Sequence, residues 1–167
     1  LGALCRELKA ERVLLISDPG LLRAGLLDAP LQAMRDSGLQ VTLYSDVQAD
    51  PPAASVQDAV EVARQCRAQV VIGLGGGSSL DTAKLVALLC GHEQRLEDIY
   101  GIGLAKGPRL PLIQVPTTAG TGSEATTVTV ITDSASHVKR LLGGERSSLW
   151  RHKAVGKHGK RVYIVQA

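Results

Sequence analysis

Apolar runs of five or six residues alternate with longer amphipathic stretches over the first 115 residues of the chain. Four of these runs predict strands, and runs that are mainly aliphatic are typical of strands buried on both faces: residues 12–17, 40–44, 70–74 and 110–115. Between them, apolar side chains recur at helical spacing: residues 21–37, 53–67 and 79–90. Helices that connect buried strands imply right-handed crossovers and parallel strands. The pattern predicts an α/β fold, a Rossmann-like parallel sheet with flanking helices.

The pattern changes after the fourth strand. Residues 126–131 are rich in β-branched side chains, which favour strand, and residues 137–142 can return antiparallel after a polar turn. We therefore expect a β-hairpin here, whereas residues 98–107, further upstream, are expected to form a loop. Beyond the glycines at 143–144 the periodicity is lost, and only residues 161–165 have the composition of a further short strand.

A glycine-rich turn joins the third strand to its helix. The segment Gly73–Lys84 begins in the apolar strand and opens the apolar helical stretch. Glycines let a backbone approach a ligand closely, and the first amides of a helix attract phosphate, so the turn favours a nucleotide pyrophosphate. Gly73, Gly75 and Ser78 almost match the Gly-x-Gly-x-x-Gly fingerprint, which normally follows the first strand. A purely structural turn is the alternative. A P-loop is excluded, because no Gly-Lys-Ser/Thr follows.

Asp81 lies one turn into this helix. Ser78 and Asp81 have the spacing of a capping box, with Asp in place of Glu. A carboxylate that faced a phosphate would repel it. We therefore expect Asp81 to brace the turn by accepting hydrogen bonds from its amides.

Two further polar features follow strands. The loop Thr117–Ser123 offers hydroxyls and glycines that suit a phosphate or a ribose, although an ordinary Ser/Thr turn has the same composition. Asp18 ends the first strand, where an acidic side chain can hold ribose hydroxyls and repel a 2′-phosphate, favouring NAD over NADP. A simple turn residue or a helix cap is the alternative for Asp18. Ligands of parallel sheets bind at the carboxyl ends of the strands, and all three features lie there.

The composition is that of a globular protein with an aliphatic core. The 167 residues are 44% apolar and 21% charged, with 2% aromatics and no Phe. No apolar run approaches the roughly 20 residues that span a bilayer, and the first residues lack the layout of a signal peptide. The three cysteines, an odd number without metal spacing, indicate a reducing compartment: Cys5, Cys66 and Cys90. We expect a cytoplasmic protein without a membrane partner.

The net charge of +3 is unevenly distributed. Residues 1–133 carry 11 basic and 15 acidic side chains, a net charge of −4, whereas residues 134–167 carry eight basic and one acidic, a net charge of +7. The basic character thus belongs to the end of the chain, which lacks an aromatic platform for stacking bases. We expect no nucleic-acid partner.

The histidines do not indicate a metal or catalytic site. None of the four forms a His-x-x-x-His pair, and none lies in a predicted helix with a carboxylate at ligand spacing: His92, His137, His152 and His158. The sequence also contains no Cys-x-x-Cys, no paired-carboxylate motif and no catalytic triad pattern. We expect no catalytic and no metal-binding residue in this chain.

Two motifs together resemble one family. Residues 75–84 (GGGSSLDTAK) and residues 116–124 (PTTAGTGSE), followed by VITD at 130–133, are similar to the signature blocks of the iron-containing (group III) alcohol dehydrogenases. The resemblance covers residues 11–142. It implies a dehydroquinate synthase-like N-terminal domain that binds NAD(P), and a helical C-terminal domain that holds Fe²⁺ or Zn²⁺. In such enzymes hydride passes between an alcohol carbon and the nicotinamide, with the metal as Lewis acid.

The resemblance also implies cofactor-binding residues. The residues implied to contact the pyrophosphate are Gly76, Gly77 and Ser78, and Asp81 belongs to the same motif. Asp18 matches the acidic position associated with a preference for NAD. Three threonines match residues around the phosphates and the nicotinamide ribose: Thr117, Thr118 and Thr121. Three further residues come from the hairpin, two on the strand that lines the cofactor and a lysine that reaches the cofactor ribose: Thr126, Val128 and Lys139.

The last part of the chain departs from the family. The family's metal ligands, an Asp and a His four residues apart on a helix and two further His, have no equivalent here. Residues 144–153 resemble nothing in the family, and the charge changes sign near that point. Our hypothesis is a truncated product in which residues 1–142 form the NAD(P)-binding domain and the metal-binding helical domain is absent. Residues 143–167 are then an atypical basic tail, non-native or disordered.

The sequence thus predicts the cofactor-binding half of an NAD-dependent alcohol dehydrogenase, an oxidoreductase that acts on a small alcohol or aldehyde. One alternative is a catalytically inactive nucleotide-binding remnant. Another is a relative of the same fold, either a glycerol or polyol dehydrogenase or a synthase of the dehydroquinate type. The TTAGTG block at 117–122 favours the alcohol branch. We expect this chain alone to be inactive, with a homodimer as the candidate assembly.

Overall fold

Two β-sheets organise the part of the chain that the computed structural model describes, residues 1–133, 136, 138–144, 151–155 and 162–166. The larger sheet has the strand order β2-β1-β3-β5-β9-β8. Its strands are β1 (Arg12–Ile16), β2 (Gln40–Tyr44), β3 (Val70–Gly75), β5 (Leu112–Pro116), β8 (Arg151–Val155) and β9 (Val162–Gln166). The first four run parallel, whereas β9 pairs antiparallel with β5 and with β8. The parallel part confirms the predicted Rossmann-like α/β fold.

The smaller sheet has the order β4-β7-β6. It contains the predicted hairpin, in which β6 (Val128–Thr132) pairs antiparallel with β7 (Lys139–Gly144). The predicted loop at 98–107 is wrong, because the short 3₁₀-helix η1 (Leu96–Ile99) and strand β4 (Gly101–Ala105) occupy it. Two glycines in β4 hide its strand character in the sequence. The strand is stabilised by parallel pairing with the distant β7.

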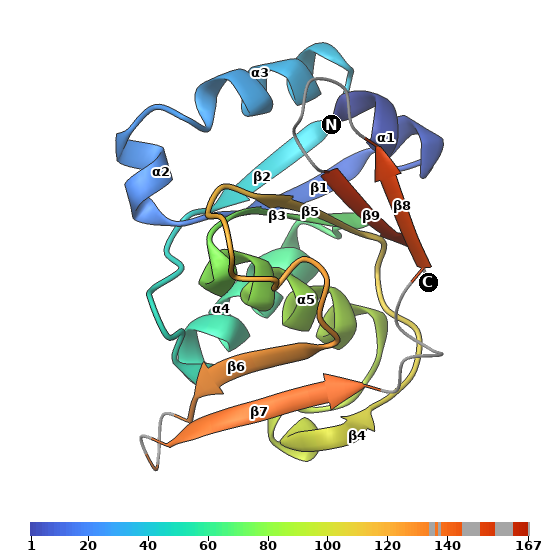
Figure 1. The fold of residues 1–167 in the computed structure, drawn as a ribbon. Helices are drawn as coiled ribbons and strands as arrows, with labels where there is room; N and C mark the ends of the chain where they lie inside the picture. Colours follow the sequence, from blue (N-terminus) through green and yellow to red (C-terminus); the bar gives the residue numbers. More distant parts are fainter. Residues whose placement is uncertain (134–135, 137, 145–150, 156–161, 167) are drawn as a thin grey trace.

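Helices cover both faces of the larger sheet (Figure 1). One face carries α1 (Gly2–Glu7), α2 (Pro19–Arg23) and α3 (Asp28–Asp36), and the other carries α4 (Ala53–Gln65) and α5 (Gly77–Gly91). The single helix predicted over 21–37 is wrong. It is divided at Gly25, whose φ of +68° ends α2 and turns the chain before α3. Among the described residues, no helix has both the length and the apolar character needed to cross a membrane.

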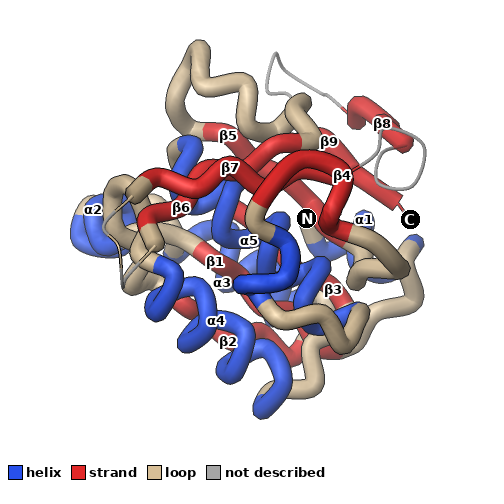
Figure 2. The backbone as a smooth tube through the Cα atoms, turned by 90° about the horizontal axis from the view of Figure 1, so that it is seen from below, coloured by secondary structure: helices blue, strands red, loops and turns tan. Residues whose placement is uncertain are grey.

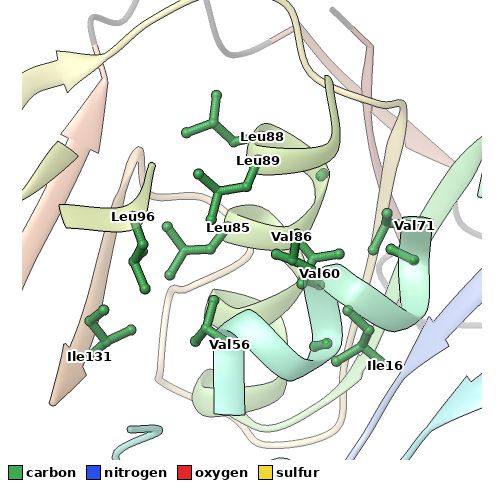
Figure 3. Packing of buried hydrophobic residues seen from close by; sticks show 14 of the residues in the cluster. Ile16, Val56, Val60, Val71, Leu85, Val86, Leu88, Leu89, Leu96 and Ile131 are labelled. Atoms are coloured by element: carbon green, nitrogen blue, oxygen red, sulfur yellow. The ribbon is translucent and has the colours of Figure 1, made fainter. Parts of the chain in front are cut away.

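Helix α5 is buried on all sides because it lies between the two sheets. Figure 2 views the molecule from the side of the smaller sheet, whose strands cross in front of α5. Figure 3 shows Val86 on the side of Val71 in the larger sheet and Leu85 on the side of Ile131 in the smaller one. A helix that is apolar around its whole circumference requires such burial, and residues 79–89 are all buried.

The segment expected to be an atypical tail contains β8 and β9. The short strand predicted at 161–165 corresponds to β9, which adds to the edge of the larger sheet beside β5. Strand β7 ends at Gly144, two residues beyond the domain boundary proposed at 142. The division into a domain of residues 1–142 and a tail of residues 143–167 stays a prediction.

Candidate functional site

The carboxyl ends of β1 and β3 lie side by side and open onto a pocket. The buried Ser17 hydroxyl donates a 2.8 Å hydrogen bond to the carbonyl oxygen of Leu74, which ties the two strand ends together. The pocket has a volume of about 580 Å³ and is lined by Asp18, Pro19, Gly20, Arg23, Val47, Gln48, Ala49, Gly76, Gly77, Ser78 and Ser79. The structure therefore brings four of the predicted site residues together at one edge of the sheet: Asp18, Gly76, Gly77 and Ser78.

The glycine turn opens helix α5 directly. Gly75 has a φ of +154°, and a Cβ there would lie 2.6 Å from the Ser79 hydroxyl oxygen, so the turn requires glycine at this position. Gly76 is the N-cap and receives no side-chain capping bond. The predicted capping box of Ser78 and Asp81 is therefore wrong, because the helix already begins at Gly77. The first amides of α5 have no partner inside the helix and are available to an anion.

The Thr117–Ser123 loop lies against this turn. The Thr117 amide donates a 2.9 Å hydrogen bond to the Gly75 carbonyl oxygen. A Cβ added to Gly76 would lie 3.3 Å from Thr118 Oγ1, and a Cβ added to Gly77 would lie 3.1 Å from Ser123 Oγ and 3.5 Å from Thr121 Cβ. Two predicted threonines, Thr118 and Thr121, thus lie beside the predicted glycines. Together they form a cradle of backbone and hydroxyl groups, in which a side chain at either glycine would crowd the loop.

Asp18 both caps a helix and faces the pocket. Its Oδ1 accepts hydrogen bonds from the amides of Gly20 (2.9 Å) and Leu21 (3.0 Å) at the start of α2. The Ser79 hydroxyl donates to its other oxygen over 3.5 Å. The cap considered from the sequence is therefore present. It leaves the carboxylate at the wall of the pocket, where it contributes negative charge.

Asp81 faces away from the turn, towards β6. It accepts a 3.3 Å hydrogen bond from the Val130 amide, so the expectation that it accepts amides of the glycine turn is wrong. Its other oxygen lies 2.8 Å from Lys84 Nζ, one turn further along α5. Burial lowers the pKa of Lys84, while the neighbouring carboxylates of Asp81 and Glu124 oppose that shift. The assignment of Asp81 to the cofactor site stays a prediction.

The hairpin residues lie on the other side of α5. Lys84 Nζ donates to Thr126 Oγ1 over 3.3 Å and to the Val128 carbonyl oxygen over 2.9 Å, which joins two of the predicted residues to α5. Lys139, the third, forms a 3.0 Å ion pair with Asp50 at the surface. Asp50 directly follows the pocket-lining residues 47–49. The roles of these three residues towards a cofactor stay predictions.

The sequence did not indicate one wall of the pocket. Val47, Gln48 and Ala49 follow strand β2, and Arg23 ends the short helix α2. The same rule that singled out Asp18 applies to residues 47–49, because they also lie at the carboxyl end of a parallel strand. No side-chain pattern marked them, since two of the three are apolar.

The described ranges do not offer a metal site. Within 1–133, 136, 138–144, 151–155 and 162–166, no three His, Cys, Asp or Glu side chains gather as ligands. The described residues therefore do not fit the Fe²⁺ or Zn²⁺ of the resembled family.

A sequence model of the iron-containing alcohol dehydrogenases matches residues 1–148. This chain belongs to the iron-containing alcohol dehydrogenase family. Similar members of the family include a sulfoacetaldehyde reductase from Bilophila wadsworthia, 36% identical over 140 residues, and an NAD-dependent methanol dehydrogenase from Bacillus methanolicus, 36% identical over 145 residues. These alignments cover 84% and 87% of this chain but only 36% and 38% of the relatives. The chain thus spans little more than a third of the curated relatives' length.

Solved structures of the iron-containing alcohol dehydrogenase family have the same fold. A 1,3-propanediol oxidoreductase aligns with a TM-score of 0.81 at 32% identity, covering 86% of this chain and 38% of that one. A sulfoacetaldehyde reductase from Bifidobacterium kashiwanohense, solved in complex with NAD⁺, aligns with a TM-score of 0.74 at 25% identity, covering 87% and 38%. Family membership and the α/β fold are therefore established independently of the site residues.

Proposed function

We propose that this chain forms the NAD-binding part of an alcohol dehydrogenase of the iron-containing type. The observation that carries the proposal is the cradle at the start of α5. Gly76 and Gly77 let the threonine loop approach the backbone closely, since a Cβ at either would lie within 3.3 Å of Thr118 or Ser123, and the pocket beside these glycines extends to Asp18. A dinucleotide needs such close backbone approach to its pyrophosphate together with room for the attached ribose.

The residues fit NAD in the following roles. The amides at Gly77 and Ser78 bind the pyrophosphate, with the hydroxyls of Thr118 and Thr121 on the opposite side. Asp18 holds ribose hydroxyls and repels a 2′-phosphate, which favours NAD over NADP. When bound, NAD supplies the hydride acceptor for oxidation of an alcohol. Relatives named as an NAD-dependent methanol dehydrogenase and as an NAD⁺ complex support this choice of cofactor.

The second candidate is a protein that binds the nucleotide without turnover. It is favoured by the lack of a metal-ligand cluster in the described ranges. The resembled family uses its metal to polarise the substrate oxygen, so we propose that this polypeptide by itself does not oxidise alcohols. An assay with NAD, short alcohols and added Fe²⁺ or Zn²⁺ tests this, and sustained NADH formation would contradict it.

Titration of the full chain with NAD and NADP tests the proposed cofactor. We expect saturable heats with NAD, weaker heats with NADP, and amide shifts at Gly76, Gly77 and Ser78 in nuclear magnetic resonance spectra. Gly38, in the turn after α3, is the internal control and should not shift. The absence of binding at millimolar NAD, or shifts confined to residues outside the pocket, would overturn the proposal.

A further inference from the structure

The edge of β6 that faces away from β7 is partly covered by groups from α5 and from the segment that precedes α4. Three backbone groups along this edge have partners. The Val128 carbonyl oxygen accepts from Lys84 Nζ over 2.9 Å, and the Val130 amide donates to Asp81 over 3.3 Å. The Thr132 amide donates to the carbonyl oxygen of Pro51 over 2.9 Å. The groups belong to every second residue of β6, which is the spacing at which the backbone groups of a strand point to the same edge.

Two of the three partners are the members of one ion pair on α5. Lys84 and Asp81 lie 2.8 Å apart and three residues apart in sequence, and the Lys84 side chain is only 5% exposed. A buried ion pair is seldom a net source of stability, because both charges lose their hydration. This pair recovers hydrogen bonds by donating to a strand carbonyl and accepting from a strand amide. The arrangement imitates the backbone of a neighbouring strand.

The same helix begins at the glycine cradle. Asp81 lies one helical turn beyond Gly77, so the pair connects the cradle to the hairpin through a rigid segment. Glu124, the other carboxylate near Lys84, belongs to the segment between the Thr117–Ser123 loop and the hairpin. The carboxylates around Lys84 therefore come from α5 and from the chain that leads into β6, while Arg109 lines the same pocket as Lys84.

We propose that Lys84 and Asp81 are positioning residues that take the place of a missing strand beside β6 and thereby hold the hairpin at a fixed distance from the glycine cradle. In this role the pair acts through the hairpin and needs no contact with the cofactor. Its consequence for cofactor affinity rests on the proposed NAD function, whereas its effect on β6 does not. Lys84 is the last residue of the 75–84 motif and was not among the predicted site residues.

The first experiment measures β6 alone. In the full chain, a scalar coupling across the hydrogen bond should connect the Val130 amide nitrogen to the Asp81 carboxyl carbon. Hydrogen exchange at Val130 should accelerate about tenfold in Asp81→Ala, while Asp81→Asn, which keeps an acceptor oxygen, should remain close to the wild type. Amides of β1 and β3 are the controls for intact folding. A missing coupling in the wild type, or unchanged Val130 exchange in a folded Asp81→Ala, overturns the inference.

The second experiment measures NAD affinity in the same variants. We expect Asp81→Ala and Lys84→Met to bind NAD about tenfold more weakly, with Asp81→Asn intermediate. The reason is that the hairpin is no longer held at a fixed distance from the cradle. Unchanged affinity together with faster Val130 exchange would overturn the positioning role. If the wild type fails to bind NAD, the proposed function fails, and the exchange measurement still decides whether the pair supports β6.

Discussion

The Thr117 amide donates a 2.9 Å hydrogen bond to the carbonyl oxygen of Gly75, which joins the glycine turn to the threonine loop where the two segments leave the sheet. This contact follows from the register of the sheet, because Gly75 is paired with Pro116 on the adjacent parallel strand. Two motifs that are far apart in the sequence therefore leave the sheet at the same level. The cradle depends on this register. Substitutions in and around the cradle should change NAD affinity and protein stability by different amounts.

Replacing Gly77 with Ala should weaken NAD binding without unfolding the protein. The added methyl group would lie 3.1 Å from Ser123 Oγ, a side chain that can move, and Gly77 does not need a left-handed conformation. Stability should therefore change by less than about 1 kcal/mol. NAD affinity, measured by calorimetry, should fall about tenfold or more because the methyl group occupies the cradle.

Gly38→Ala is the matched control for this variant. Gly38 has a φ of +81° and open space around it, so alanine meets strain but no clash. We expect a loss of about 1 kcal/mol of unfolding free energy and unchanged NAD affinity. If Gly77→Ala binds NAD as the wild type does, the cradle is not the pyrophosphate site.

Asp18 has a structural role as a helix cap and an electrostatic role at the pocket wall, and two substitutions should distinguish them. Asp18→Ala removes the acceptor of the Gly20 and Leu21 amides and should cost about 1 kcal/mol of unfolding free energy. Asp18→Asn keeps an acceptor oxygen and should cost little, but it removes the negative charge from the pocket wall. The affinity for NADP relative to NAD should therefore rise in both variants. Equal losses of stability, or an unchanged cofactor ratio, would contradict this assignment.

The parts that the sequence predicted well are those governed by local pattern. Strands β1, β3 and β5 follow from mainly aliphatic runs, the partly exposed edge strand β2 from a short run of strand-forming residues, and the position of the pocket from where these runs end. The contact between Asp81 and Val130 could not be predicted in this way. The spacing of Asp81 to Ser78 suggested a cap, whereas the Val130 amide is brought to Asp81 by the hairpin folding over α5.

Strand β4 shows the same limitation. Glycines at 101 and 103 carry positive φ angles, so neither periodicity nor propensity indicated a strand there. Its pairing with Leu142 and Gly143 in β7 supplies the hydrogen bonds that local sequence could not reveal. Strand β4 was therefore missed because its local sequence carries no strand signal and its partner β7 is distant in the chain.

Cys90 should react slowly with alkylating reagents. Burial raises the pKa of its thiol to about 11, so only about 0.1% is thiolate at pH 8, compared with about a quarter of a free thiol. We expect iodoacetamide labelling, followed peptide by peptide with mass spectrometry, to be about a hundredfold slower than for glutathione. The rate should rise about tenfold per pH unit up to about pH 11. A plateau below pH 9 would show that the thiol ionises normally.

Lys84 should make the protein more stable as the pH rises into the alkaline range. Burial lowers the pKa of its ammonium group in the folded state, so between that pKa and the ordinary value near 10.5 the unfolded chain binds more protons. Unfolding free energy therefore increases with pH through this window. Asp81 and Glu124, the carboxylates that face Lys84, reduce the size of the effect but do not reverse its sign.

The measurement is the difference in unfolding free energy between the wild type and Lys84→Met, followed by urea denaturation from pH 7 to about pH 10.5. Other groups titrate in both proteins and largely cancel, so the difference should rise in favour of the wild type as the pH increases. Lys106→Met, at an exposed lysine, controls for the removal of one positive charge. A difference that falls with pH would mean that the ion pair with Asp81 outweighs the burial of Lys84. Lys84 would then hold its proton more tightly in the folded protein than in water.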